Sequence, residues 1–282
     1  MARRLCLVSV LVLLLSACVA PSSVKQYADT TKQTIERAKP VVKDYVDDCG
    51  DRQLPLLHSD ATQEKWQCKD VAKLAGPFNT MADFISAYAD ALSALSASEG
   101  VKYKGQTADV VGAAENLPGF ANDKVRIDAV GALSDLMLHW AEEGYREKKI
   151  RQALDASNAQ IVDVSAAIAD FMTEISKVYR NHVDAIPTLQ LLGEGDSKSR
   201  PPYAVRVLFN DYLEKRQADY SAKQTSSAAL AGQIKKIGET NTQLMHQAND
   251  LTGADAIKVA NDFYQTASPV WKTVDDAFAT QH

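Results

Sequence analysis

Residues 150–185 read IRQALDASNAQIVDVSAAIADFMTEISKVYRNHVDA, and this stretch decides the fold. Alternating steps of four and three residues from Ile150 reach eleven positions, of which nine are apolar. An apolar residue every 3.5 residues on average is typical of a helix that packs along its whole length against another helix. The positions of this seam are Ile150, Leu154, Ser157, Ile161, Val164, Ile168, Phe171, Ile175, Val178, His182 and Ala185.

Residues 209–251 repeat the pattern with four polar positions in the seam. We expect two of them, Arg216 and Lys223, to extend toward solvent or to pair with acidic residues of the helix predicted over residues 150–185. The third, Asn241, resembles the buried amides that fix the register of coiled coils. The seam consists of Phe209, Leu213, Arg216, Tyr220, Lys223, Ser227, Leu230, Ile234, Ile237, Asn241, Leu244, Ala248 and Leu251.

Proline placement predicts how these helices are joined. Residues 119–186 and 203–268 contain no proline, and the segment between them is rich in Pro, Gly and Ser. Two long helices joined by a loop explain this arrangement, so we expect an antiparallel hairpin with its tip near residues 187–202. The fold class is therefore all-α, an elongated helical bundle with a long antiparallel coiled-coil-like hairpin. We expect one domain over residues 23–282. Its base is formed by the first helix (24–48), the second (59–98, broken at Gly76-Pro77) and the final helix (about 253–279).

Composition supports a helical protein and excludes one class of partner. The chain has 41 alanines and only 7% aromatic residues, which favours helix over sheet. Its formal charge is −5, and no long Lys/Arg run is present. Binding to nucleic acid depends on a basic surface, so we expect no nucleic-acid partner.

The amino terminus has the three parts of a secretory signal. Arg3 and Arg4 precede an apolar run that leads to Leu15-Ser16-Ala17-Cys18. The apolar run is too short to span a membrane as a helix, so we interpret residues 1–17 as a signal peptide. Its removal would leave a mature chain with a formal charge of −7.

Residues 15–18, Leu-Ser-Ala-Cys, resemble the lipobox of bacterial lipoproteins. The resemblance implies cleavage before Cys18, diacylglycerol on its sulfur and a lipidated tether over residues 18–22. Val19 stands where lipoproteins kept at the inner membrane often have Asp, so the resemblance implies an outer-membrane anchor that faces the periplasm. The alternative is an ordinary signal peptide cut near Ala17 or Ala20, with an unmodified Cys18.

Two further cysteines remain in the mature chain, Cys49 and Cys68. In an oxidising compartment they are expected to form one disulfide, which closes a ring of about 20 residues and contributes roughly 3 kcal/mol. Two buried free thiols are the alternative. A redox couple is disfavoured because the spacing is far from CxxC.

The sequence contains no recognisable catalytic or metal-binding motif. The five histidines are scattered, and neither a nucleophile elbow, a phosphate loop nor a dinucleotide-binding glycine pattern is present. His139 lies near Glu142 and Glu143, which is more typical of a solvated helix face than of a metal site. His182 occupies a seam position as a packing residue. We expect no enzyme, no metal and no cofactor.

The segment near the hairpin tip is the expected contact surface for a protein partner in the envelope. Arg200 and Tyr203 are the candidate contacts because interfaces are enriched in Arg and Tyr, although a solvated connector is the simpler interpretation. The leading hypothesis is a lipid-anchored adaptor, spacer or scaffold that presents a helical rod to this partner. The alternatives are a membrane-active or pore-forming helical protein, and a carrier of a small apolar ligand, which only the alanine-rich residues 82–98 suggest.

Overall fold

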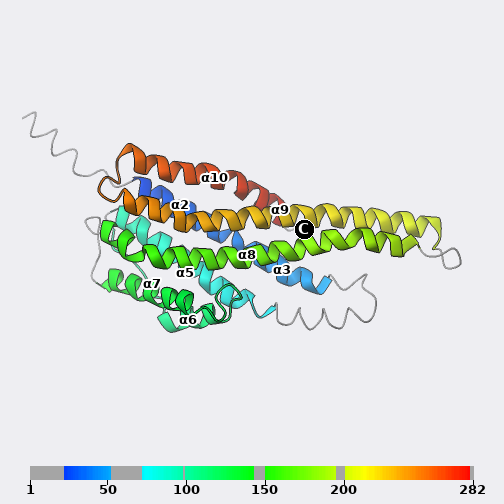
Figure 1. The fold of residues 1–282 in the computed structure, drawn as a ribbon, viewed down its shortest axis with the longest axis horizontal. Helices are drawn as coiled ribbons and strands as arrows, with labels where there is room; N and C mark the ends of the chain where they lie inside the picture. Colours follow the sequence, from blue (N-terminus) through cyan, green and yellow to red (C-terminus); the bar gives the residue numbers. More distant parts are fainter. Residues whose placement is uncertain (1–21, 52–71, 98, 143–149, 195–200, 280–282) are drawn as a thin grey trace, which may run out of the picture.

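The computed structural model describes residues 22–51, 72–97, 99–142, 150–194 and 201–279. All regular secondary structure in these ranges is helical, which confirms the all-α class. The longest elements are α8 (Ile150–Glu194) and α9 (Tyr203–His246), which pack antiparallel (Figure 1). With a rise of 1.5 Å per residue, α8 is about 68 Å long. The predicted hairpin is therefore present.

The predicted seam of α8 is buried from Ile150 to Ile175. Beyond that residue the buried stripe moves by one position, to Ser176, Tyr179 and Ile186, while Ala185 is exposed. The cause is geometric: a straight helix has 3.6 residues per turn, so a strict 3.5-residue repeat drifts by about 20° per heptad. Over five heptads the drift equals one residue.

Helix α9 has two buried stripes because it lies between two helices. Its predicted seam is buried at ten positions, Leu213, Tyr220, Lys223, Ser227, Leu230, Ile234, Ile237, Asn241, Leu244 and Leu251 just beyond the helix. A second stripe faces α10 (Ala254–Phe278), where Ser226 Oγ donates to the carbonyl of Thr273 at 3.0 Å. Figure 1 shows α10 running beside α9.

The N-terminal helices complete this side of the bundle. A single residue separates helix α2 (Ser22–Glu36) from helix α3 (Ala38–Asp51). Pro40 lies in the first turn of α3, where its missing N–H breaks no helical bond. Tyr27 donates its hydroxyl proton to the carbonyl of Ile237 in α9 at 3.1 Å. Trp271 Nε1 in α10 donates to Thr34 Oγ1 at 3.1 Å. These bonds tie α2 to both C-terminal helices.

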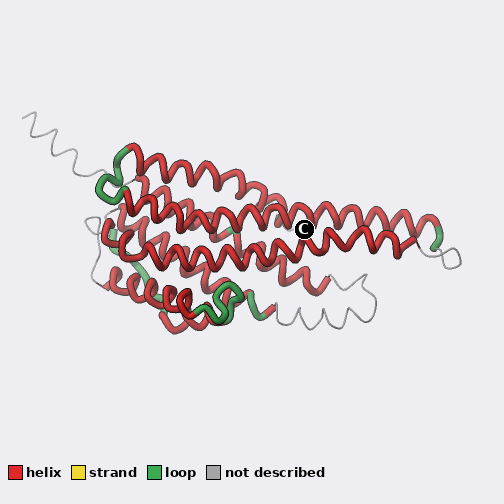
Figure 2. The backbone as a smooth tube through the Cα atoms, in the orientation of Figure 1, coloured by secondary structure: helices red, strands yellow, loops and turns green. Residues whose placement is uncertain are grey.

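Three further helices pack on the other side of α8 or on its neighbours: α5 (Ala75–Ser96), α6 (Thr107–Glu115) and α7 (Lys124–Glu142). The alanines of α5 at positions 82, 89 and 91 are buried in the hydrophobic core. They allow close helix packing, so they supply no evidence for a ligand cavity. Figure 2 shows the short loops that join the described helices, such as residues 247–253.

Three details of the prediction are corrected. The base contains α6 and α7 in addition to the three expected helices, of which α5 is the described part of the second. The proline-free run 119–186 is not one helix, since α7 ends at Glu142 and α8 begins at Ile150. Pro187 lies inside α8, on an exposed position, so the tip begins only after Glu194.

Candidate functional site: the distal hairpin

The hairpin extends well beyond the other described helices (Figure 1). We call residues 179–191 of α8 and 203–220 of α9 the distal hairpin. Six of the ten large apolar side chains that are exposed in the described ranges lie here: Leu191, Tyr203, Val205, Val207, Leu208 and Tyr212. Leu191, Tyr203 and Leu208 have exposed fractions of 72%, 75% and 70%. Because soluble proteins seldom expose clustered large apolar side chains, this surface is the candidate interaction site.

The exposed residues of α9 form two stripes on different sides of the helix. The first stripe consists of Val205, Leu208 and Tyr212, which are three and four residues apart. The second consists of Tyr203 and Val207, one turn apart. At 100° per residue the stripes are about 150° apart on the face of α9 that points away from α8, and about 210° apart across the seam. The buried Leu213 and half-buried Phe209 lie between them on the side of α8.

Arginines support the exposed tyrosines. The guanidinium of Arg206 lies 5.8 Å from the ring centre of Tyr203, and that of Arg216 lies 5.6 Å from the ring of Tyr212. Arg216 Nε also donates to the hydroxyl of Tyr212 at 3.1 Å. Burial alone would lower the pKa of the Arg216 guanidinium. The hydrogen bond to Tyr212 and the charge of nearby Asp48 outweigh this effect, so the net pKa is raised and the cation is firmly held. Tyrosines held in this way are suitable interface anchors.

Helix α3 fixes the hairpin where it leaves the bundle. Lys223 Nζ donates to Asp44 Oδ1 at 3.1 Å and lies 3.1 Å from Asp219 Oδ2, while the Tyr179 hydroxyl donates to Asp44 Oδ2 at 2.8 Å. Burial lowers the pKa of Lys223, yet the two carboxylates outweigh it and the net pKa is raised. Lys223 therefore remains charged in this half-buried cluster.

The acidic partners of the α9 seam cations differ from the expected ones. Arg216 approaches Asp48 and Lys223 contacts Asp44, both in α3 rather than in α8. The seam has no acidic position in α8, whereas α3 packs close enough to supply two. His182, which is half-buried, lies 5.1 Å from Tyr220 between ring centres, in keeping with a packing role.

A polar network lies in the proximal hairpin, as the sequence predicts for Asn241. Its Oδ1 accepts from the Tyr88 hydroxyl at 2.9 Å, and its Nδ2 donates to Asn158 Oδ1 at 3.0 Å. Tyr88 also contacts Ser157 Oγ at 2.9 Å. Burial raises the pKa of Tyr88, so its hydroxyl stays protonated. The network fixes the heights of α5, α8 and α9 relative to one another.

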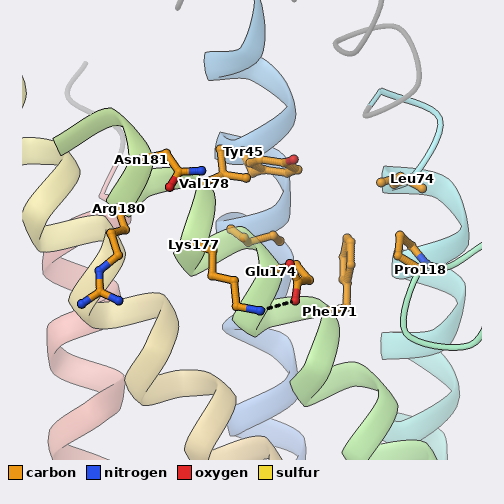
Figure 3. Close-up of a pocket in the computed structure, with 10 residues that line it drawn as sticks. Tyr45, Leu74, Pro118, Phe171, Glu174, Lys177, Val178, Arg180 and Asn181 are labelled. Carbon is orange, nitrogen blue, oxygen red and sulfur yellow. Dashed lines mark hydrogen bonds and ion pairs between the residues drawn. The ribbon is translucent and has the colours of Figure 1, made fainter. Parts of the chain in front are cut away.

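An open groove runs along α8 beside α3 and has a volume of about 460 Å³ (Figure 3). Tyr45 and Phe171 are its aromatic lining residues, and Leu74 and Pro118 lie on the side of Phe171. Its charged lining residues are Glu174 and Lys177, which pair with each other at 2.7 Å, and Arg180. The groove thus offers mainly apolar contact.

The predicted site residues fall in different parts of the chain. Cys18, Cys68 and Arg200 lie outside the described residues, as do the signal peptide and most of the tether. Cys49 is buried in α3. Its pairing with Cys68 stays a prediction because Cys68 lies outside the described residues. Tyr203 is the first residue of α9 and is highly exposed.

No group of three or more His, Cys, Asp or Glu side chains in the described ranges is placed to hold a metal ion. Among the described helices, none combines the length and the apolar character that a membrane span requires.

Sequence reasoning missed most of the exposed apolar residues. Stepping along the seam from 209 onward assigned Phe209 and Leu213 to packing and ignored Val205, Val207, Leu208 and Tyr212. The missed signal is that the start of α9 is apolar on nearly all sides, which is typical of a helix that is buried in a larger assembly. The surface is thus larger than the predicted Tyr203 contact.

Comparison of the chain with protein-family models, curated proteins and solved structures gives no match.

Proposed function

We propose that this protein is a lipid-anchored interaction protein of the bacterial envelope, an adaptor, spacer or scaffold. Its hairpin presents the distal apolar surface to a protein partner in the periplasm. The protein would act by binding rather than by catalysis, and the membrane would be contacted through the lipid on Cys18.

The observation that carries the proposal is the exposed apolar surface at the end of the projecting hairpin. Burial of Leu208 or Leu191 against a partner would remove apolar area from water, which stabilises an assembly by about 25 cal/mol per Å². The core of the protein does not require these side chains, because the seam at this height is filled by Phe209 and Leu213.

The position of the start of α2 supports an anchored rod. Ser23, at the start of α2, donates to the carbonyl of Leu251, which follows the proximal end of α9. The chain thus enters the bundle at the end opposite the hairpin tip (Figure 1). A lipid on Cys18, five residues earlier, would hold that end at the membrane and leave the tip directed away from it.

In-cell photo-cross-linking tests this function. A photoreactive residue at Tyr203 is expected to capture an envelope protein, whereas the same residue at Val125, 70% exposed on α7, is expected to capture little. Equal capture at both positions would contradict a specific role for the tip.

The anchor is tested separately. Cys18→Ala is expected to release the protein into the soluble periplasmic fraction and to abolish its activity in the cell. Full activity of the soluble variant would show that anchoring is not part of the mechanism.

The exposed apolar tip also favours a second candidate, a membrane-active helical protein. Tyrosines and arginines beside Leu and Val side chains are suited to the interface of a bilayer. Dye release from liposomes separates the candidates, since a spacer should cause none at concentrations where the membrane-active protein empties the vesicles.

A disulfide between Cys49 and Cys68 would tie the end of α3 to the segment that precedes α5. We expect a proteolytic digest without reductant to contain one peptide pair joined through these two residues. Separate peptides that are both reactive with a thiol reagent would exclude the disulfide.

A further inference from the structure

We propose that copies of this chain pack side by side through the distal hairpin, with the first stripe of one copy against the second stripe of the next. The proposal rests on the proposed function for the parallel orientation of the copies, and it names their partner as a further copy of the chain. Within the described ranges it is carried by the two apolar stripes and by two charged residues at the same height.

The placement of the stripes determines the type of contact. Val205, Leu208 and Tyr212 lie on one side of α9, and Tyr203 and Val207 lie on another, with the seam between them. A partner that covers one side leaves the other in water. A second copy covers both, because each copy offers each stripe to a different neighbour, and such a head-to-tail contact generates rings or rows.

The copies are parallel because their anchored ends share a membrane. Helix α2 begins at the end of the bundle opposite the tip (Figure 1). Lipids on Cys18 in one leaflet would direct every hairpin the same way. Residues with the same number then lie at the same height in neighbouring copies, so contacts between the stripes involve residues close in number.

Charge complementarity supports this arrangement. Glu214 continues the second stripe, two turns beyond Val207, and Lys215 continues the first, three residues beyond Tyr212. Both are exposed, and in parallel copies their heights differ by only about 1.5 Å. Lys215 Nζ pairs with Asp211 in its own chain at 2.8 Å, but an ammonium group has three donors and can also reach Glu214 of a neighbour.

The apolar contact is tested by a matched pair of substitutions in the mature lipidated protein in mild detergent. Multi-angle light scattering should give a protein mass that is a multiple of the chain mass. Leu208→Glu should reduce it to one chain, whereas Val125→Glu should leave it unchanged, since both parent side chains are 70% exposed. Circular dichroism should show the same helix content in both variants, because neither residue is in the core.

The charge contact is tested by reversal and rescue. Glu214→Lys places a lysine opposite Lys215 of the neighbour, and Lys215→Glu places two glutamates together. Each should weaken association about tenfold, equivalent to about 1.4 kcal/mol, as measured by sedimentation velocity over a dilution series. The double reversal should restore most of the affinity. Rescue shows that Glu214 of one copy and Lys215 of another are in contact.

Three outcomes overturn the inference. They are a single-chain mass for the parent protein, equal dissociation by Leu208→Glu and Val125→Glu, and failure of the double reversal to restore association. A single-chain parent protein that is still acylated and cross-links to a different protein through Tyr203 overturns the inference and leaves the proposed function intact. If the native protein carries no lipid but still forms multimers, the proposed anchor is wrong and the association between copies stands, because light scattering measures mass whether or not lipid is present.

Discussion

The proximal end of α9 buries its apolar side chains and the distal end exposes five of them, although both belong to one continuous helix. Leu230, Ile234 and Ile237 lie in the seam and are fully buried. Val205, Leu208 and Tyr212 lie beside the seam and are exposed. The difference comes from the neighbours: proximal α9 packs against α8, α10 and α2, whereas the tip has α8 as its only partner among the described helices (Figure 1).

This comparison separates residues that stabilise the fold from residues that are available for binding. Leucine has the same side chain at both ends, and only its burial differs. A hairpin needs one seam to hold two helices together, so apolar side chains outside that seam contribute little to the stability of an isolated chain. The external contact that we propose would account for their presence at the tip.

The largest expected effect tests this separation directly with two leucines of α9. Leu230→Ala should reduce the free energy of unfolding by about 2–5 kcal/mol, because it removes a buried side chain and leaves a cavity. Leu208→Ala should change it by no more than about 0.5 kcal/mol. Urea unfolding followed by circular dichroism, at concentrations too low for association, measures both. Similar losses in the two variants would mean that the tip is part of the core.

Much of the proximal hairpin could be predicted because a regular repeat is a local property of the sequence. The burial of Asn241 and of the α9 seam followed from spacing alone. The shift of the α8 stripe after Ile175 did not, since a strict 3.5-residue template cannot show the drift of a straight helix. A template with 3.6 residues per turn would have found Tyr179 and Ile186.

The distal site was predicted only in part, for a different physical reason. Whether an apolar side chain is buried depends on which helices reach its height, and α10 ends before the tip (Figure 1). The sequence does not state that limit. The pairing of Lys223 with Asp44 was hidden similarly, because the contact joins residues 179 positions apart. Tyr203 was found because it directly follows the proline-rich loop.

A smaller effect, with opposite signs at two positions, is expected for the glycines of α9. A Cβ at Gly238 would lie 2.7 Å from Ser165 Oγ and 2.8 Å from Val162 Cα, so the backbones of α8 and α9 would have to separate. At Gly232 an added Cβ meets nothing within 4 Å. Gly238→Ala should cost about 1–3 kcal/mol through overpacking. Gly232→Ala should stabilise the protein by about 0.5–1 kcal/mol through helix propensity.

Thermal unfolding of both glycine variants measures the difference. A stabilising Gly238→Ala would show that the helices are not in close contact at this height. Because the two sites are six residues apart on one helix, the propensity term is common to both, and the difference between them isolates the contact with α8.

The smallest effect concerns pH and the junction between the two halves of the hairpin. The raised pKa of Lys223 means that its cation is stabilised in the folded state. The contribution is fully present below the pKa of lysine in the unfolded chain, about 10.4, and is lost as the pH rises through the higher folded value. We expect its size to be about 1 kcal/mol, because Asp44 and Asp219 have side chains that are 29% and 35% exposed.

Lys223→Met should abolish this part of the alkaline loss of stability, whereas Lys215→Met, whose lysine is 76% exposed on the same helix, should retain it. Unfolding in urea at pH 8 and above pH 10 gives the difference, and equal alkaline losses in the parent protein and Lys223→Met would show that the cluster with α3 does not hold the hairpin.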